Sequence, residues 1–212
     1  MAETNNAQNK GRGRGLKGIV VILAIIALLV MWGVGVYNNL VGHQEAVETA
    51  VGNVENAYQV RADLIPNLVA TVKDYADFEQ ETLTKVIEAR AKATQTTLDP
   101  SNLTEEQLKA FNEAQSEVSG ALSRLLVTIE RYPDLKANQN YLDLQQKLES
   151  CENAISKARK DFNETAKTYN TYLRRFPNNV IANFGNFEKK PYFEAITEGA
   201  ETAPNVGDLF NK

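Results

Sequence analysis

Side chains that commonly carry out catalysis or bind metals are scarce in this 212-residue sequence, which contains one histidine and one cysteine. A catalytic zinc site normally uses two or three histidines, and no His-Glu-x-x-His motif is present. The sequence also lacks a Gly-x-Ser-x-Gly nucleophile elbow and a glycine-rich phosphate-binding loop. We therefore expect no catalytic residue, no metal site and no cofactor, and we predict that the protein is not an enzyme.

The remaining reactive groups have simple structural explanations. Cys151 falls on an apolar helical stripe, which favours a small core residue over a nucleophile. His43 is expected to be an exposed histidine close to the membrane. Glu105 and Glu106 occupy the first turn of a predicted helix, where the helix dipole favours negative charge.

Several charged side chains lie in or beside apolar helical stripes, where they must pair or lose hydration at a high cost. They can form pairs between helices and so fix the register of the helices. Alternatively, they flank the apolar seam and extend to water. The candidate register-fixing residues are Arg61, Asp63, Arg90, Glu152 and Arg159.

A long apolar stretch, residues 19–36, contains no charged side chain. As a helix it spans about 27 Å, close to the thickness of a bilayer core. A cleaved signal peptide is the competing interpretation, but the apolar core exceeds the usual ~7–15 residues and no Ala-x-Ala site follows it. We predict a transmembrane helix at residues 19–36, preceded by a disordered basic tail at residues 1–18.

Charge around this helix predicts its orientation. Lys10, Arg12, Arg14 and Lys17 precede the helix, and the first basic residue after it is Arg61. Basic residues favour the cytoplasmic side, so we expect a single-pass inner-membrane protein with its N-terminus in the cytoplasm and its bulk in the periplasm. Trp32 and Tyr37 lie near the outer end of the helix, where such rings favour the interface. Without the tail and the apolar stretch, 19 Lys and Arg stand against 26 Asp and Glu, so this part is acidic and nucleic-acid binding is not expected.

The rest of the chain shows helical periodicity and no strand pattern. Helices are expected from Pro66 to about Gln95, from Thr104 to Tyr132 and, most clearly, from Tyr141 to Phe176, where apolar residues recur every three or four positions like a coiled-coil seam. We predict an all-α fold: the transmembrane helix followed by a long antiparallel up-and-down bundle of three to four helices at residues 37–176.

Two features of the bundle leave alternatives open. Pro66 either kinks a helix or occupies its first turn, and in the second case Asp63 serves as the N-cap. The stretch that leaves the membrane carries an apolar stripe, which we expect to need a partner helix beyond the bundle. This stripe consists of Leu40, Val47, Val51 and Val54.

The last segment, residues 177–212, contains aromatic residues that are unlikely to be left in water together, although its end is expected to be flexible. Either they fold back over the bundle or they bind a partner. The candidate partner-contact residues are Phe184, Phe187, Tyr192 and Phe193.

Several motifs in order resemble the LemA family between about Tyr37 and Phe193. They include Asp63-Leu-Ile-Pro-Asn-Leu-Val69, Tyr132-Pro-Asp-Leu-Lys136 and Phe176-Pro177. The resemblance implies a bacterial single-pass membrane protein with an antiparallel helical bundle and no established catalytic residues. It also implies that the protein acts through other membrane proteins, among them a membrane-embedded zinc metalloprotease. Some members of the family are found in magnetosome membranes.

Two functions follow from these observations. The first is a scaffold or adaptor that forms a homo-oligomer and binds other membrane proteins. The alternative is lipid binding or membrane remodelling. Residues 41–60 contain three glutamates and no Lys or Arg, which argues against binding to anionic lipid in this region.

Overall fold

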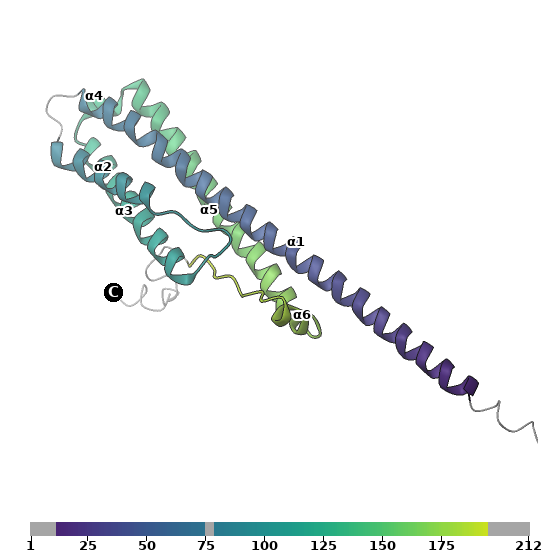
Figure 1. The fold of residues 1–212 in the computed structure, drawn as a ribbon. Coiled ribbons are helices and arrows are strands. Elements are labelled where there is room, and N and C mark those ends of the chain that lie inside the picture. Colours follow the sequence, from purple (N-terminus) through teal and green to yellow (C-terminus); the bar gives the residue numbers. More distant parts are fainter. Residues whose placement is uncertain (1–11, 75–78, 195–212) are drawn as a thin grey trace, which may run out of the picture.

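The computed structural model describes residues 12–74 and 79–194, with side chains from residue 17 onward. This part of the chain is helical and contains no β-strand, which confirms the predicted all-α class. Figure 1 shows one very long helix with the other helices gathered along one half of it. The helices are α1 (Arg12–Lys73), α2 (Gln80–Gln95), α3 (Glu105–Ile129), α4 (Pro133–Lys136), α5 (Gln139–Arg174) and α6 (Asn178–Phe184).

Helix α1 runs without a break through the apolar stretch and into the bundle (Figure 1). It has 62 residues, which corresponds to a length of about 93 Å. It begins at Arg12, inside the stretch for which a disordered tail was predicted, and residues 1–11 lie outside the described part. It also continues through Pro66, so of the two alternatives at this proline the first turn of a new helix, with Asp63 as its N-cap, is wrong. The stretch predicted as one helix from Pro66 to about Gln95 is divided between the end of α1 and α2.

The apolar stretch and the bundle part of α1 differ sharply in exposure. From Ile19 to Met31 the large apolar side chains of α1 are at least 50% exposed, whereas Val36 is 5% exposed and Leu40 is fully buried. A core helix of a soluble protein would be covered on most sides. The described chain thus contains one helix that is long and apolar enough to cross a membrane, and its apolar stretch is not covered by the protein itself.

The membrane-proximal core of the bundle forms where α5 runs antiparallel to α1. The stripe from Leu40 to Val54 packs against Ile155, Phe162 and Tyr169 of α5. We expected this stripe to need a partner outside the bundle, and this expectation was wrong. Because α5 extends to Arg174, it reaches back to the end of the apolar stretch, and no bare stalk separates the bundle from this stretch.

A second, membrane-distal core lies beyond the first along α1 and α5. It joins the last turns of α1, from Ile65 to Val72, to the paired helices α2 and α3 and to the beginning of α5. Thr104 and Gln107 form the predicted capping box that begins α3. Helix α3 ends before Pro133, as the proline predicts.

After α5 the chain turns through the short helix α6 and then runs in an extended conformation back along α5. We call residues 188–194 the strap; it is the last part of the chain that the structure describes. Figure 1 shows the strap beside the bundle, with α6 at the end of the bundle that faces the free half of α1.

Candidate functional site

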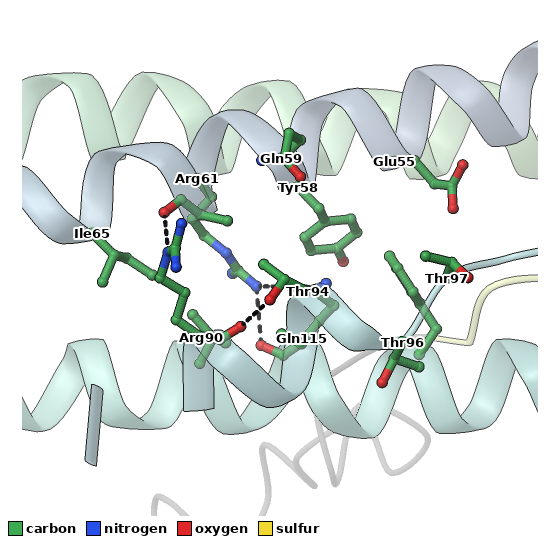
Figure 2. A pocket seen from close by; sticks show the side chains of 14 residues that line it. Glu55, Tyr58, Gln59, Arg61, Ile65, Arg90, Thr94, Thr96, Thr97 and Gln115 are labelled. Atoms are coloured by element: carbon green, nitrogen blue, oxygen red, sulfur yellow. Dashed lines mark hydrogen bonds between the residues drawn. The ribbon is translucent and has the colours of Figure 1, made fainter. Parts of the chain in front are cut away.

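A buried arginine lies at the boundary between the two cores. Arg61 of α1 is 2% exposed and reaches toward α3 (Figure 2). Its guanidinium donates to the backbone oxygen of Gln115 at 3.1 Å, to the Gln115 side-chain oxygen at 2.6 Å and to the Ser119 hydroxyl at 2.8 Å. It also pairs with Glu152 of α5 at 3.0 Å and lies over the Tyr58 ring. One side chain therefore links α1, α3 and α5 at a single level, here called the Arg61 layer.

The helix interruption expected at Pro66 is compensated by a second arginine. Proline has no N–H, so in a helix it leaves the carbonyl four residues earlier, here that of Ala62, without its usual donor. Arg90 of α2 donates its Nε–H to the Ala62 oxygen at 2.7 Å. This bond satisfies the carbonyl that Pro66 cannot, and it docks α2 onto α1.

A cavity of about 70 Å³ lies beside the two arginines, between α1, α2 and α3. Figure 2 shows Tyr58 and Arg61 of α1, Arg90 of α2 and Gln115 of α3 around it. Sites for organic ligands usually have ~300–1,000 Å³, whereas this space suits a few water molecules. The arrangement is suited to fixing the helices relative to one another, and it is too small for a substrate.

The strap is held on α5 by two asparagines. Asn170 donates to the Lys190 carbonyl at 2.8 Å and accepts from the Lys190 N–H at 2.9 Å. Asn163 makes the same pair of bonds with Phe193, at 2.9 and 2.8 Å. Seven helical residues rise about 10.5 Å and three extended residues cover about 10 Å, so the two spacings match. The strap therefore runs antiparallel to α5 in a defined register.

Arg159, Tyr169 and Lys190 complete the attachment. Arg159 donates to the Glu194 carbonyl at 2.6 Å and to the Tyr58 hydroxyl at 3.2 Å, and it lies over the Phe193 ring. The Tyr169 hydroxyl donates to the Glu188 carbonyl at 2.9 Å. Burial raises the pKa of Tyr169 to about 12, with a further contribution from Glu188. The buried Lys190 ammonium donates to the Ser101 carbonyl in the loop before α3.

The structure brings together four of the five candidate register-fixing residues in interhelical or strap contacts. Arg61 and Glu152 contact each other, Arg90 contacts α1, and Arg159 contacts both α1 and the strap. Asp63 differs, because it is exposed and accepts a bond from Gln59 one turn away on its own helix.

The four candidate partner-contact aromatics lie in different environments. Phe193 is 5% exposed and packs edge-on against Phe162 and Phe111. Phe187 is half-buried beside Tyr37, at a ring distance of 5.4 Å. The other two, Phe184 and Tyr192, are exposed at 88% and 39%.

Asn163 and Asn170 were recognised in the sequence as polar residues beside the apolar seam, but not as the residues that hold the strap, and the role of Gln115 and Ser119 in holding Arg61 was missed. The available signal was the seven-residue spacing of two asparagines beside the apolar seam of α5. An extended strap has no periodic pattern that would have predicted its position.

The two side chains most often reactive in proteins, Cys151 and His43, are both packed against other parts of the chain. Cys151 is buried, and burial together with Glu152 raises the pKa of its thiol, which disfavours the reactive thiolate. His43 is half-buried against the Tyr172 ring rather than exposed as expected. Within the described residues, no group of three or more His, Cys, Asp or Glu side chains could hold a metal ion.

A sequence model of the LemA family matches residues 50–207, more than half of the chain. The chain belongs to the LemA family. The match confirms the resemblance found in the sequence motifs. It also shows that the Arg61 layer, the strap and α6 all lie within the LemA region.

Individual LemA-family relatives are distant in sequence but similar over most of their length. Magnetosome protein MamQ 2 of Paramagnetospirillum magneticum is 26% identical over 198 residues, which cover 85% of this chain and 71% of the relative. Magnetosome protein MamQ of Magnetospirillum gryphiswaldense is 25% identical over the same shares. Protein LemA of Metamycoplasma hominis is 24% identical over 164 residues, 77% of this chain and 71% of the relative.

Proposed function

We propose that this protein is a non-enzymatic membrane adaptor, which holds other membrane proteins beside its bundle and associates with copies of itself. The observation that carries the proposal is the unbroken helix α1, which contains both the exposed apolar stretch and one wall of the bundle. A partner that packs on this stretch is thereby placed on a fixed side of the bundle, because no flexible linker separates the two.

The side of α1 available to such a partner can be identified. Val60 is 54% exposed and lines a shallow groove between α1 and α5, together with Leu64 and Ala154. With 100° per residue, Leu28 in the apolar stretch lies about 40° from Val60 around the helix axis. Leu28 and Val60 therefore lie on the same side of α1, and this side presents an apolar side chain at both levels. Helices in a bilayer associate through close packing of this kind.

A role without catalysis agrees with the described side chains. The cavity beside Arg61 has room only for water, and burial disfavours the Cys151 thiolate. The buried Arg61, Arg159, Asn170 and Lys190 are engaged in contacts between helices and with the strap. These features support a role in which the helices and the strap are held in a fixed arrangement.

Membrane proteins are the partner class that we propose, and the family resemblance adds a membrane-embedded metalloprotease to this class. The excess of basic residues before the apolar stretch supports an inner-membrane location with the bundle in the periplasm. An impermeant thiol reagent applied to intact cells tests this topology on a Cys151→Ala variant with an added C-terminal cysteine. Protection of the added cysteine would reverse the proposed topology.

Photo-crosslinking in native membranes tests the adaptor role. A photoreactive residue placed at Leu28 or at Val60 should capture the same protein or a second copy of the chain. Ile26 serves as the matched control, because it is 50% exposed but lies about 160° from Leu28 around the helix. Lipid adducts alone at Leu28 and Ile26 and no protein adduct at Val60, together with a particle of one 23.5 kDa chain in mild detergent, would contradict the proposal.

A further inference from the structure

The turn that contains α6 exposes an unusual apolar surface. Phe176 and Phe184 are 84% and 88% exposed, more than Met31, which at 72% is the most exposed large apolar side chain of the apolar stretch. Val180, between them in sequence, is 43% exposed. The opposite side of α6 is packed, since Ala182 is 1% exposed. Helix α6 is thus anchored on one side and exposes Val180 and Phe184, and Phe176 is exposed in the turn that precedes it.

The position of α6 along α1 places this surface at the end of the apolar stretch. A side chain at Gly33 would lie 3.5 Å from Ile181 of α6, and the Phe187 ring packs against Tyr37. Gly33 lies within the predicted span at residues 19–36. Figure 1 shows α6 at the point where α1 leaves the bundle. If α1 crosses a bilayer, α6 lies at the level of the interface.

Charges near α6 agree with this location. Arg174 and Arg175 end α5 immediately before Phe176, and both are exposed. On the other side of α6, Glu188 and Lys189 are exposed and offset each other. On α1, residues 18–44 contain no charged side chain. The exposed charge next to the phenylalanines is therefore positive.

We propose that the α6 turn is a membrane-contacting foot, in which Phe176, Val180 and Phe184 insert into the interface of the same bilayer that α1 crosses. Arg174 and Arg175 bind the phosphates of anionic lipid headgroups beside them. Aromatic rings favour the bilayer interface, and basic residues favour an anionic surface. Trp32 and Tyr37 of α1 lie at the same level and extend this aromatic belt.

This surface could not be recognised from the sequence around the membrane exit. Residues 41–60 contain no basic side chain, which argued against contact with anionic lipid. The fold supplies the basic residues from the far end of α5, which returns to the membrane after more than a hundred residues. The foot gives the bundle a second membrane contact in addition to α1. The bilayer then covers the exposed phenylalanines, and no partner protein is needed to cover them.

Tryptophan fluorescence of the full-length chain in lipid nanodiscs tests the foot. Trp32 is the only tryptophan, so Trp32→Phe provides a silent background. In this background, Phe184→Trp is expected to emit at short wavelength, to lose most of its emission to lipids brominated near the headgroup, and to resist aqueous iodide. Val127→Trp is the matched control, since Val127 is 70% exposed on the water-facing side of α3, beside the distal core; it should be quenched by iodide alone.

Each outcome at position 184 is decisive. Quenching by brominated lipid supports the foot. Quenching by iodide shows a water-exposed surface, and resistance to both quenchers shows that protein, a second copy or a partner, covers α6; either result overturns the proposal. Phe176→Trp repeats the measurement independently, and circular dichroism establishes that each variant is folded.

The arginine contacts are tested by comparing two brominated lipids at equal mole fraction in mixed nanodiscs, one anionic and one neutral. The Phe184→Trp probe should be quenched more strongly by the anionic lipid, because the arginines enrich it locally. Arg174→Gln combined with Arg175→Gln should remove this preference, whereas Lys167→Gln, on an exposed position of α5 farther from α6, should retain it. Equal quenching by both lipids without these substitutions would overturn the headgroup contact.

Discussion

The membrane-proximal and membrane-distal cores share two walls, α1 and α5, but differ in the third. In the distal core the third wall is a pair of helices, α2 and α3, whose backbones satisfy their own hydrogen bonds and which dock mainly through apolar side chains. In the proximal core it includes the extended strap, whose backbone has no internal partners. Asn163, Asn170 and Arg159 supply those bonds from α5. An extended segment that packs on a helix thus needs polar side chains on that helix to bond its backbone. A helix packed in the same place needs only apolar side chains there.

The Arg61 layer separates these two cores. Tyr58 and Cys151 belong to the proximal core, while Ile65 and Leu148 belong to the distal one. Because the Arg61 donors need acceptors on both α3 and α5, sliding either helix by one turn would leave a buried charge without partners. The layer therefore favours one alignment of two cores that apolar packing alone would define less strictly.

The largest expected effect is the loss of the apolar anchor of the strap. Phe193→Ala should lower the free energy of unfolding by about 3 kcal/mol, because it removes a buried ring from the proximal core. The measurement is urea unfolding of the full-length chain in mild detergent, followed by circular dichroism. Phe184→Ala is the control, with an expected change below about 0.5 kcal/mol. A loss in Phe193→Ala as small as that in Phe184→Ala would show that the strap does not contribute to the core.

Removal of the charge between the cores should have the next largest effect. Arg61→Ala should cost about 2–3 kcal/mol, since Gln115 and Ser119 lose their buried partner. Arg61→Met should lower the free energy of unfolding by less, because methionine keeps most of the volume of the arginine side chain. Glu152→Gln should cost less than about 1 kcal/mol, because Glu152 is 50% exposed. The same unfolding assay checks all three; a large effect of Glu152→Gln would show that the ion pair dominates the layer.

The compensation at Pro66 can be measured by a double-mutant cycle. Arg90→Met should cost about 1–2 kcal/mol, because the Ala62 carbonyl loses its donor. In the Pro66→Ala background the cost should fall by about 1 kcal/mol, because the restored N–H can bond to this carbonyl. Additive effects of the two substitutions would contradict the proposed compensation.

The effect that is smallest at neutral pH is a pH dependence confined to the strap. The pKa of Tyr169 is raised to about 12 from an ordinary value near 10, so the folded protein favours the protonated phenol. This contribution to stability is complete below pH 10 and is lost as the pH rises from about 10 to about 12. Proteolysis of the strap over this range should increase.

Tyr169→Phe should abolish this alkaline step. Unfolding of the distal core provides the control, because Tyr141, whose pKa burial also raises, lies there and is unaffected by the substitution. An unchanged alkaline step in Tyr169→Phe would assign it to another group.

Features that depend on local pattern were predictable from the sequence. The apolar steps of α5, the Thr104 capping box and the stop at Pro133 all appear where they were expected. The length of α1 was not predictable at Pro66, because the group that compensates for the proline is Arg90, 28 residues away from the carbonyl it binds. Whether a proline ends a helix thus depended on a tertiary contact.

The candidate site was predictable in part, because some of its residues show in the local pattern and others act only through tertiary contacts. Charged residues in apolar stripes indicated Arg61 and Arg159, because a buried charge needs partners whatever the fold. Their partners were less predictable, since Gln115, Asn163 and Asn170 are ordinary polar residues at helix positions. Asp63 shows the limit of the same reasoning, because its position beside the stripe turns out to face water.

Because α1 is continuous, a change in the tilt of its apolar stretch also tilts the part of α1 inside the bundle. From Val36 to Lys73 the helix extends about 55 Å beyond the predicted membrane surface. A change of about 10° in the tilt of the span, well within the range that transmembrane helices adopt, would displace the far tip of the bundle by about 10 Å. Changes in bilayer thickness that alter this tilt are therefore converted into movements of the distal helices that are several times larger than the change in thickness itself.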